Sequence, residues 1–301
     1  TPTLSQEVPY TADAAPVTWT ARREQRPTDI HIRSLVHRYP NGVLALNGVD
    51  LSFDPGEVVA IMGRNGSGKT TLLKHCNGSL RATEGSIRLG HEEVGRRPVD
   101  EIAGTVGLVF QDPSDQLFGR SVEREVSFGP RNLRLDTALV ERLVDQALAM
   151  TGLGSQRTRN PYDLGVSTRK LVALASVLAM DPAVLLLDEP TTGQDASGKQ
   201  LVAAVLGAWA DIGRTVLAVT HDMEFAARHF GRIVVMGEGR VLLDGAPEKI
   251  FVGENVPVLA SAGLRLPQTA EIGVALGLGP PLPSTVAELV YRARGVTPPP
   301  T

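Results

Sequence analysis

Residues 63–70 read Gly-Arg-Asn-Gly-Ser-Gly-Lys-Thr, and this stretch constrains the fold more than any other part of the sequence. It matches the pattern G-x-x-x-x-G-K-[ST] in full, after an apolar, strand-like run at Val58–Met62 and before a helical pattern at Thr70–His75. In this pattern glycines let backbone N–H groups wrap around phosphate oxygens, the lysine adds a positive charge, and the last hydroxyl is a ligand for Mg²⁺. A chance glycine-rich turn is the alternative, and the flanking strand and helix argue against it. The sequence therefore predicts a nucleoside triphosphate site formed by Gly63, Arg64, Asn65, Gly66, Ser67, Gly68, Lys69, Thr70 and Thr71.

Two adjacent acids end a second buried strand. The apolar run Val184–Leu187 leads directly into Asp188 and Glu189. A parallel strand ending beside the phosphate loop would bring Asp188 within reach of Mg²⁺. Glu189 is then placed to act as the base that activates water for attack on the terminal phosphorus. In isolation two such acids would more often begin a solvated loop, but the phosphate loop favours the catalytic interpretation.

The remaining apolar patterns predict an α/β fold with a mostly parallel core sheet. A further short, largely apolar strand is expected at Thr215–Val219, and helical periodicity occurs at Leu139–Met150 and Thr168–Met180. Buried strands separated by helices are typical of parallel sheets. An alternating pattern from residue 30 and a strand at Ala45–Phe53 predict an antiparallel subdomain beside this core. We find no internal repeat, which excludes a solenoid.

Composition shifts divide the chain into three parts. We expect a mobile arm at residues 1–28, a nucleotide-binding domain at 29–251 and a C-terminal helical extension at 252–301. Proline interrupts the extension, whose last helix is expected to start at Thr285 with Glu288 completing a capping box.

The charge balance and the cysteine content limit the classes of function. Thirty Lys and Arg against 33 Asp and Glu give no basic footprint for nucleic acid. The single cysteine, Cys76, excludes an internal disulfide framework and is expected to be a buried apolar residue. No apolar stretch is long enough for a spanning helix and no signal peptide is recognisable, so we expect a cytoplasmic protein.

The order of the motifs over residues 29–250 resembles that of the ATPase subunit of ABC transporters. The resemblance implies ATP and Mg²⁺ as cofactors and a P-loop NTPase fold with a helical subdomain at about residues 112–180. It implies that Tyr39 stacks on adenine (core packing is the alternative) and that Gln111 is the Q-loop glutamine, which senses Mg²⁺ and the attacking water. It further implies that His221 is the switch histidine at the terminal phosphate, and that Asp195 belongs to the D-loop, where Gln194 replaces a usually apolar residue.

A narrower resemblance is to the energy-coupling factor subgroup, which drives the uptake of vitamins or of cobalt and nickel ions. It is based on residues 110–118, 121–133 and 175–182, and on the additional C-terminal segment. It implies a second ABC ATPase subunit, a multi-span membrane coupling subunit that docks near Phe110–Arg131, and a substrate-binding membrane subunit. The chain would then lie peripherally at the cytoplasmic face of the membrane.

One motif departs from the family pattern. The signature loop usually reads L-S-G-G-Q and closes on the nucleotide of the partner subunit in a dimer, whereas this chain has Leu164, Gly165, Val166, Ser167 and Thr168. Gly165 supplies no hydroxyl and Val166 adds a Cβ where close approach is needed, although a shift of one or two residues could bring Ser167 into use. We therefore expect a heterodimer in which a partner with an intact signature completes the site at Lys69.

Two other functions stay open at this point. A non-transport ABC ATPase would usually have two cassettes in one chain or long coiled-coil arms, and the sequence has neither. A regulatory nucleotide-binding subunit with little turnover fits the altered signature loop, but Glu189 and His221 argue against it.

Overall fold

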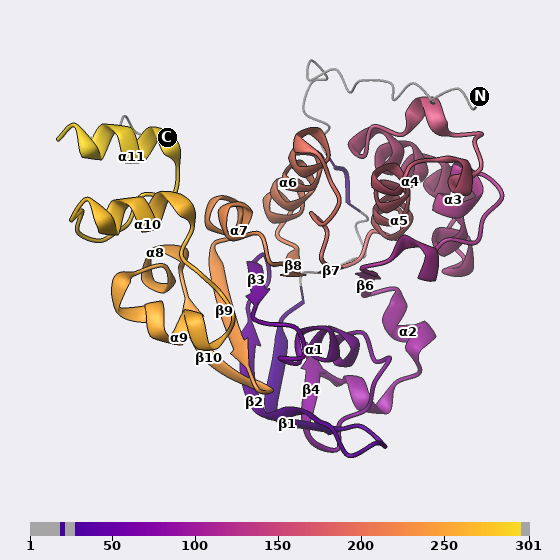
Figure 1. Ribbon diagram of the computed structural model, residues 1–301. Coiled ribbons are helices and arrows are strands. Elements are labelled where there is room, and N and C mark those ends of the chain that lie inside the picture. Colours follow the sequence, from indigo (N-terminus) through magenta and orange to yellow (C-terminus); the bar gives the residue numbers. More distant parts are fainter. Residues whose placement is uncertain (1–18, 22–27, 296–301) are drawn as a thin grey trace, which may run out of the picture.

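The computed structural model describes residues 19–21 and 28–295, and within these ranges its strands form a six-stranded and a four-stranded sheet (Figure 1). The core sheet is parallel except for its edge strand β10, and its spatial order is β10 (Arg240–Gly245), β9 (Arg232–Gly237), β3 (Val58–Met62), β8 (Thr215–Val219), β7 (Val184–Asp188) and β6 (Val106–Val109). The antiparallel sheet has the order β2 (Leu44–Phe53), β1 (Ile30–Arg38), β4 (Glu84–Leu89) and β5 (Glu92–Glu93). The prediction of an α/β fold with a parallel core and an antiparallel subdomain is confirmed.

Both faces of the five parallel strands of the core sheet are buried, which explains why these strands are apolar without alternation, whereas the edge strand β10 alternates between exposed and half-buried residues. Along β3, Val59 and Ile61 pack into the cluster formed with α1 and the antiparallel sheet, whereas Ala60 and Met62 pack into the cluster formed with the large helices. The helices are α1 (Lys69–Cys76), α2 (Val99–Ala103), α3 (Val122–Asn132), α4 (Thr137–Met150), α5 (Val166–Leu178), α6 (Ala196–Asp211), α7 (Met223–His229), α8 (Pro247–Ile250), α9 (Val256–Ser261), α10 (Gln268–Ala275) and α11 (Val286–Ala293).

Helices α3, α4 and α5 gather on one side of the molecule, and the C-terminal helices α10 and α11 lie at the opposite side (Figure 1). Helix α5 begins at Val166, two residues before the predicted start, because Gly165 adopts the extended conformation of an N-cap. Helix α11 follows Thr285 as predicted, and the Thr285 hydroxyl accepts the Glu288 N–H. The Glu288 carboxylate, however, accepts the N–H of Ser284, one residue earlier than a capping box requires.

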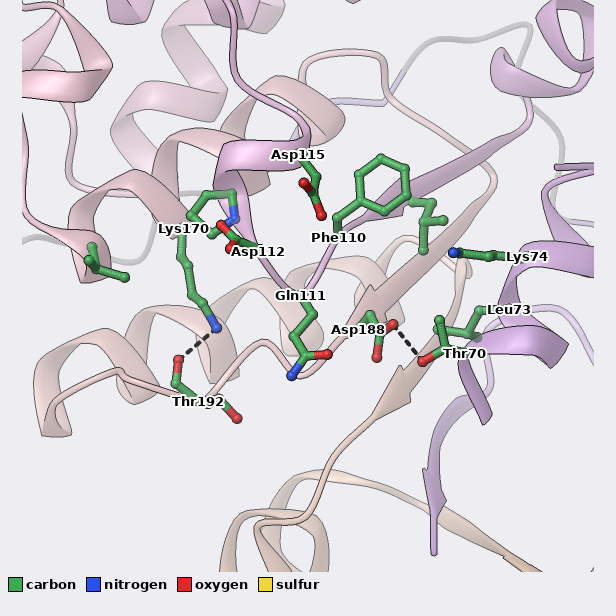
Figure 2. Close-up of a pocket in the computed structure, with 13 residues that line it drawn as sticks. Thr70, Leu73, Lys74, Phe110, Gln111, Asp112, Asp115, Lys170, Asp188 and Thr192 are labelled. Atoms are coloured by element: carbon green, nitrogen blue, oxygen red, sulfur yellow. Dashed lines mark hydrogen bonds between the residues drawn. The ribbon is translucent and has the colours of Figure 1, made fainter. Parts of the chain in front are cut away.

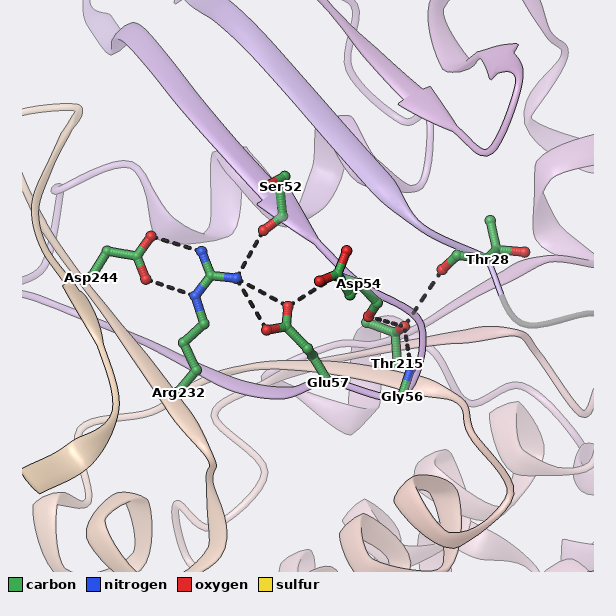
Figure 3. Close-up of polar contacts among 8 residues, drawn as sticks. All are labelled: Thr28, Ser52, Asp54, Gly56, Glu57, Thr215, Arg232 and Asp244. Carbon is green, nitrogen blue, oxygen red and sulfur yellow. Dashed lines mark hydrogen bonds and ion pairs between the residues drawn. The ribbon is translucent and has the colours of Figure 1, made fainter.

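A polar cluster joins the two sheets (Figure 3). Arg232 on β9 forms two 2.7 Å hydrogen bonds to the Asp244 carboxylate on β10 and donates to the Ser52 carbonyl oxygen on β2 at 2.8 Å. The same guanidinium contacts the Glu57 carboxylate at 3.0 Å. Since a planar guanidinium bonds carboxylates in a fixed geometry, this cluster sets the position of the antiparallel sheet on the core.

The expectation of a mobile arm over residues 1–28 is wrong for Trp19. Its side chain is 3% exposed, and its ring lies 4.8 Å from that of Trp209 on α6. The indole N–H donates to Asp181, whose carboxylate also pairs with Arg214 at 2.9 Å. Burial of a large aromatic surface holds this segment to the domain. The rest of the predicted arm lies mainly outside the described residues.

Within residues 19–21 and 28–295, the structure has no helix with the length and apolar character needed to cross a bilayer.

Candidate active site

Four parallel strands deliver the predicted site residues to one edge of the core sheet. The phosphate loop follows β3, Gln111 follows β6, Asp188 ends β7, and His221 follows β8. The carboxyl ends of parallel strands meet at the same edge, where ligands bind in open α/β sheets. Residues separated by up to about 150 positions in sequence are therefore brought together by topology alone.

Two glycines of the phosphate loop are required by its backbone path. Gly63 has φ +145° and Gly68 has φ +100°, conformations that other residues rarely adopt. A Cβ on Gly63 would lie 2.2 Å from the Met236 carbonyl oxygen, and one on Gly68 would lie 2.4 Å from the Ala45 carbonyl oxygen. The chain thus passes so close to neighbouring backbone that only glycine fits.

The Lys69 ammonium folds back onto its own loop. Its Nζ donates to the carbonyl oxygens of Gly63 at 2.6 Å and Arg64 at 2.9 Å. Burial lowers the pKa of Lys69, while the nearby carboxylates of Glu189 and Asp188 oppose this shift. The loop therefore holds a positive charge in place for phosphate oxygens.

Thr70 and Asp188 form a pair that fits Mg²⁺. The Thr70 hydroxyl donates to Asp188 Oδ2 at 2.8 Å (Figure 2). Asp188 is 6% exposed, and neither its Oδ1 nor the buried Ser67 hydroxyl has a hydrogen-bond partner among the residues that the structure describes. Hydroxyl and carboxylate oxygens are the hard donors that Mg²⁺ prefers, usually together with substrate phosphates. These two residues would hold the ion and the phosphates would complete its shell.

Glu189 is buried and held by two side chains. Its Oε1 lies 2.9 Å from His221 Nε2, and its Oε2 accepts a hydrogen bond from the Thr192 hydroxyl at 3.2 Å. Burial raises the pKa of Glu189, whereas His221 opposes the shift. A carboxylate with a raised pKa is a stronger proton acceptor, as a general base requires.

Gln111 lines a cavity of about 460 Å³ that Thr70, Asp188 and Lys170 also line (Figure 2). Its side chain points between Lys170 and Asp188. The cavity also reaches Val166 at the start of α5. The predicted Q-loop glutamine and the predicted signature loop thus share one cavity with the predicted Mg²⁺ ligands.

Tyr39 lies beside the helix that follows the phosphate loop. Its hydroxyl is 3.1 Å from the Thr71 hydroxyl, and its ring meets the His37 ring edge to face at 4.6 Å. The side chain is half-buried, so one part of it remains accessible. Stacking on adenine stays a prediction.

Arg64, Asn65 and Gly66 form the exposed tip of the phosphate loop.

The signature loop and the D-loop are in contact within the chain. Leu164 is buried, Gly165 caps α5, and Val166 is 54% exposed at the first helical position. Ser167 turns its hydroxyl to Gln194 and not outward. Thr168 is half-buried one position further along the helix. Asp195 caps α6 by accepting the Gly198 N–H at 2.7 Å.

Sequence reasoning missed two residues near the reacting centre, Lys170 and Thr192. Lys170 Nζ donates to the carbonyl oxygens of Thr192 at 2.7 Å and Glu189 at 3.3 Å, and burial lowers its pKa. Its position three residues after Ser167, on the same side of a helix, is the signal that could have found it.

Cys76, the last residue of α1, is fully buried, as expected, and burial raises the pKa of its thiol to about 12. Because only the thiolate reacts, we predict that iodoacetamide labels native Cys76 about 10³-fold more slowly at neutral pH than an exposed cysteine. The rate should continue to increase above pH 9, where an ordinary thiol reaches its plateau. Mass spectrometry with and without denaturant measures this, and rapid labelling of the native chain would contradict it.

Comparisons with known proteins relate the chain to one family. The family model described as ABC transporter matches residues 46–192. A putative ABC transporter ATP-binding protein of Geobacter sulfurreducens is 42% identical over 79% of this chain and 94% of its own. The energy-coupling factor transporter ATP-binding protein EcfA of Methanocaldococcus jannaschii is 36% identical over 81% of this chain and 87% of its own.

Solved structures agree with these similarities. The structure of cbiO1 from Clostridium perfringens, described as part of the ABC transporter complex cbiONQ, has a TM-score of 0.67 and 34% identity over 84% of this chain and all of its own. The dimeric structure of MJ0796, a bacterial ABC transporter cassette, has a TM-score of 0.67 and 26% identity over 72% of this chain and 98% of its own.

Proposed function

Because the chain belongs to the ABC transporter family and is an ATPase of that family, we propose that it powers uptake by a transporter of the energy-coupling factor type. The observation that carries the proposal is the arrangement of Lys69, Thr70, Asp188, Glu189 and His221 at one sheet edge. Similarity to proteins named EcfA and cbiO1 over more than four fifths of the chain supports the transporter type.

The chemistry assigned to this chain is attack of water on the terminal phosphorus of ATP. Backbone N–H groups of the phosphate loop and the Lys69 ammonium bind the phosphates, while bound Mg²⁺ would offset their negative charge. Glu189 accepts the proton of the attacking water as the new P–O bond forms. The bond between the terminal phosphorus and its bridging oxygen breaks, which releases ADP and inorganic phosphate. His221 holds the Glu189 carboxylate in line for this transfer.

An exposed aromatic surface near the Q-loop supports a membrane partner. Phe118 is 59% exposed and Phe128 is 45% exposed, and their rings meet edge to face at 4.5 Å. Tyr162, which is 50% exposed, donates its hydroxyl hydrogen to the Leu117 carbonyl oxygen. Exposed aromatic side chains grouped in this way are typical of protein interfaces. We assign this surface to the coupling subunit of the membrane complex.

Reconstitution tests the transport function. The chain is combined in proteoliposomes with the second ATPase and the membrane proteins encoded beside its gene, and ATP-driven uptake of labelled vitamins, Co²⁺ and Ni²⁺ is measured. We expect uptake that Lys69→Ala abolishes. ATP hydrolysis without membrane association or uptake would favour a non-transport ABC ATPase.

The altered signature loop supports a heterodimer in which this chain provides the complete site. Gly165 has φ −62° and open space where a Cβ would stand, so serine fits there without strain. We predict that the chain alone hydrolyses MgATP slowly and that Gly165→Ser with Val166→Gly raises turnover about tenfold or more, since a restored donor contacts the transition state. Phosphate release measures this, with the same pair of changes in a Lys69→Ala background as the control. Equal turnover before and after the change would favour a homodimer with a working signature loop.

A further inference from the structure

The two places where the sequence departs from the family pattern meet in space. The Ser167 hydroxyl of the signature loop donates to Gln194 Oε1 of the D-loop at 2.6 Å. Gln194 Nε2 donates back to the Ser167 carbonyl oxygen at 3.1 Å. We refer to this reciprocal pair as the Ser167–Gln194 clasp. It joins residues 27 positions apart, and it uses the hydroxyl that would otherwise be available to a nucleotide.

Burial makes the clasp the favoured arrangement of Gln194. The side chain is 9% exposed, and its amide oxygen and nitrogen are both satisfied by Ser167. A buried amide that loses its partners pays the full cost of desolvation. The amide therefore stays on Ser167 unless the surrounding backbone moves.

Helix α6 leaves room for this amide through Gly198. A Cβ added to Gly198 would lie 2.0 Å from Gln194 Oε1 and 2.9 Å from its Cδ. Gly198 has no positive φ, so its backbone conformation would accept alanine. The glycine is thus required by the position of the Gln194 side chain and not by the helix.

A second tie joins the same two segments one helical turn further on. Lys170 Nζ donates to the carbonyl oxygens of Thr192 and Glu189. The first turns of α5 are therefore fixed at two points to residues 189–194, the segment that begins with the predicted base.

We propose that Gln194 is a positioning residue. It fixes the signature loop to the segment carrying Glu189 and keeps the Ser167 hydroxyl in a hydrogen bond within this chain. The role toward a partner's nucleotide rests on the proposed function. The signature loop then offers its partner the backbone N–H groups of the first turn of α5 in place of the Ser167 hydroxyl.

The first test uses the full chain alone. Gln194→Ala should speed amide hydrogen exchange both at residues 166–170 and at residues 192–196. Gly198→Ala should do the same without altering either member of the clasp.

Gly207→Ala is the matched control, since Gly207 is exposed in the same helix with nothing within 4 Å of its Cβ position. It should leave exchange unchanged in both segments and raise the midpoint of thermal unfolding. In a Gln194→Ala background, Gly198→Ala should raise the midpoint as well. If Gly198→Ala resembles Gly207→Ala in the native background, the clasp is not closed and the proposal is overturned.

The second test measures ATP hydrolysis by the complex of this chain with its partner ATPase. Ser167→Ala and Gln194→Ala should each lower kcat/KM for ATP about five- to tenfold, the effect of one ordinary hydrogen bond, and the double variant should be no worse. Ser167→Thr keeps the hydroxyl and should retain activity. A loss above 100-fold in Ser167→Ala alone, or a gain in Gln194→Ala, would overturn the proposal because the hydroxyl would then serve the nucleotide directly. The hydrogen-exchange test needs no partner subunit. If the complex shows no ATP turnover, that result counts against the proposed function, whereas hydrogen exchange still decides whether the Ser167–Gln194 clasp is closed.

Discussion

Glu189→Gln is expected to lower ATP turnover about 10²- to 10³-fold while ATP binding persists. Glutamine has nearly the same size and keeps contact with Thr192, but it cannot accept the proton of the attacking water. Glu189 lies 2.9 Å from His221 and is 4% exposed, so water from bulk solvent cannot easily take over its role as the proton acceptor. Phosphate release in a single turnover, with a parallel measurement of nucleotide retention, separates the chemical step from binding.

A matched exposed change and the partner subunit make this experiment decisive. Glu84→Gln replaces an exposed acid on the antiparallel sheet and should leave turnover unchanged. In the heterodimer that we propose, most turnover should be lost with Glu189→Gln in this chain. If turnover survives that change and is lost when the partner's equivalent acid is changed, the partner holds the working site and our assignment is reversed.

Trp19→Ala is expected to lower the free energy of unfolding by about 3 kcal/mol, although Trp19 lies more than 40 residues before the phosphate loop. The change would remove a 3% exposed ring from its place against Trp209 and take away a hydrogen-bond donor from the buried Asp181. Chemical denaturation followed by circular dichroism measures the loss. Trp19→Phe should cost less because it keeps an aromatic ring against Trp209. A loss below about 1 kcal/mol would mean that the segment adds little to the stability of the domain.

Local sequence was enough to predict where the candidate site residues lie, because these residues stand in short motifs at strand ends. Lys69, Asp188 and His221 each follow an apolar run whose strand character is unambiguous, and parallel topology then brings them together. The antiparallel subdomain was predictable because the residues of β1 show the alternating pattern of a half-buried strand.

What sequence reasoning missed depends on contacts between distant residues. Trp19 stands in a stretch whose composition resembles a flexible arm, and only its packing against Trp209 makes it part of the core. The altered signature loop and Gln194 each read as an isolated departure, and nothing in the local pattern indicates that Ser167 and Gln194 bond to each other. The start of α5 at Val166 was missed because Gly165 in an extended conformation, not a usual capping side chain, begins the helix.

The contact between Trp19 and Trp209 also gives the chain a built-in optical reporter. These are its two tryptophans, and their rings lie 4.8 Å apart. Tryptophan emission therefore reports on a single place, the junction of the N-terminal segment with α6, and not on the nucleotide site. Release of Trp19 would expose its indole to water and shift the emission of the chain to longer wavelength. Fluorescence could then show, without any label, whether this segment stays docked while ATP binds and is hydrolysed.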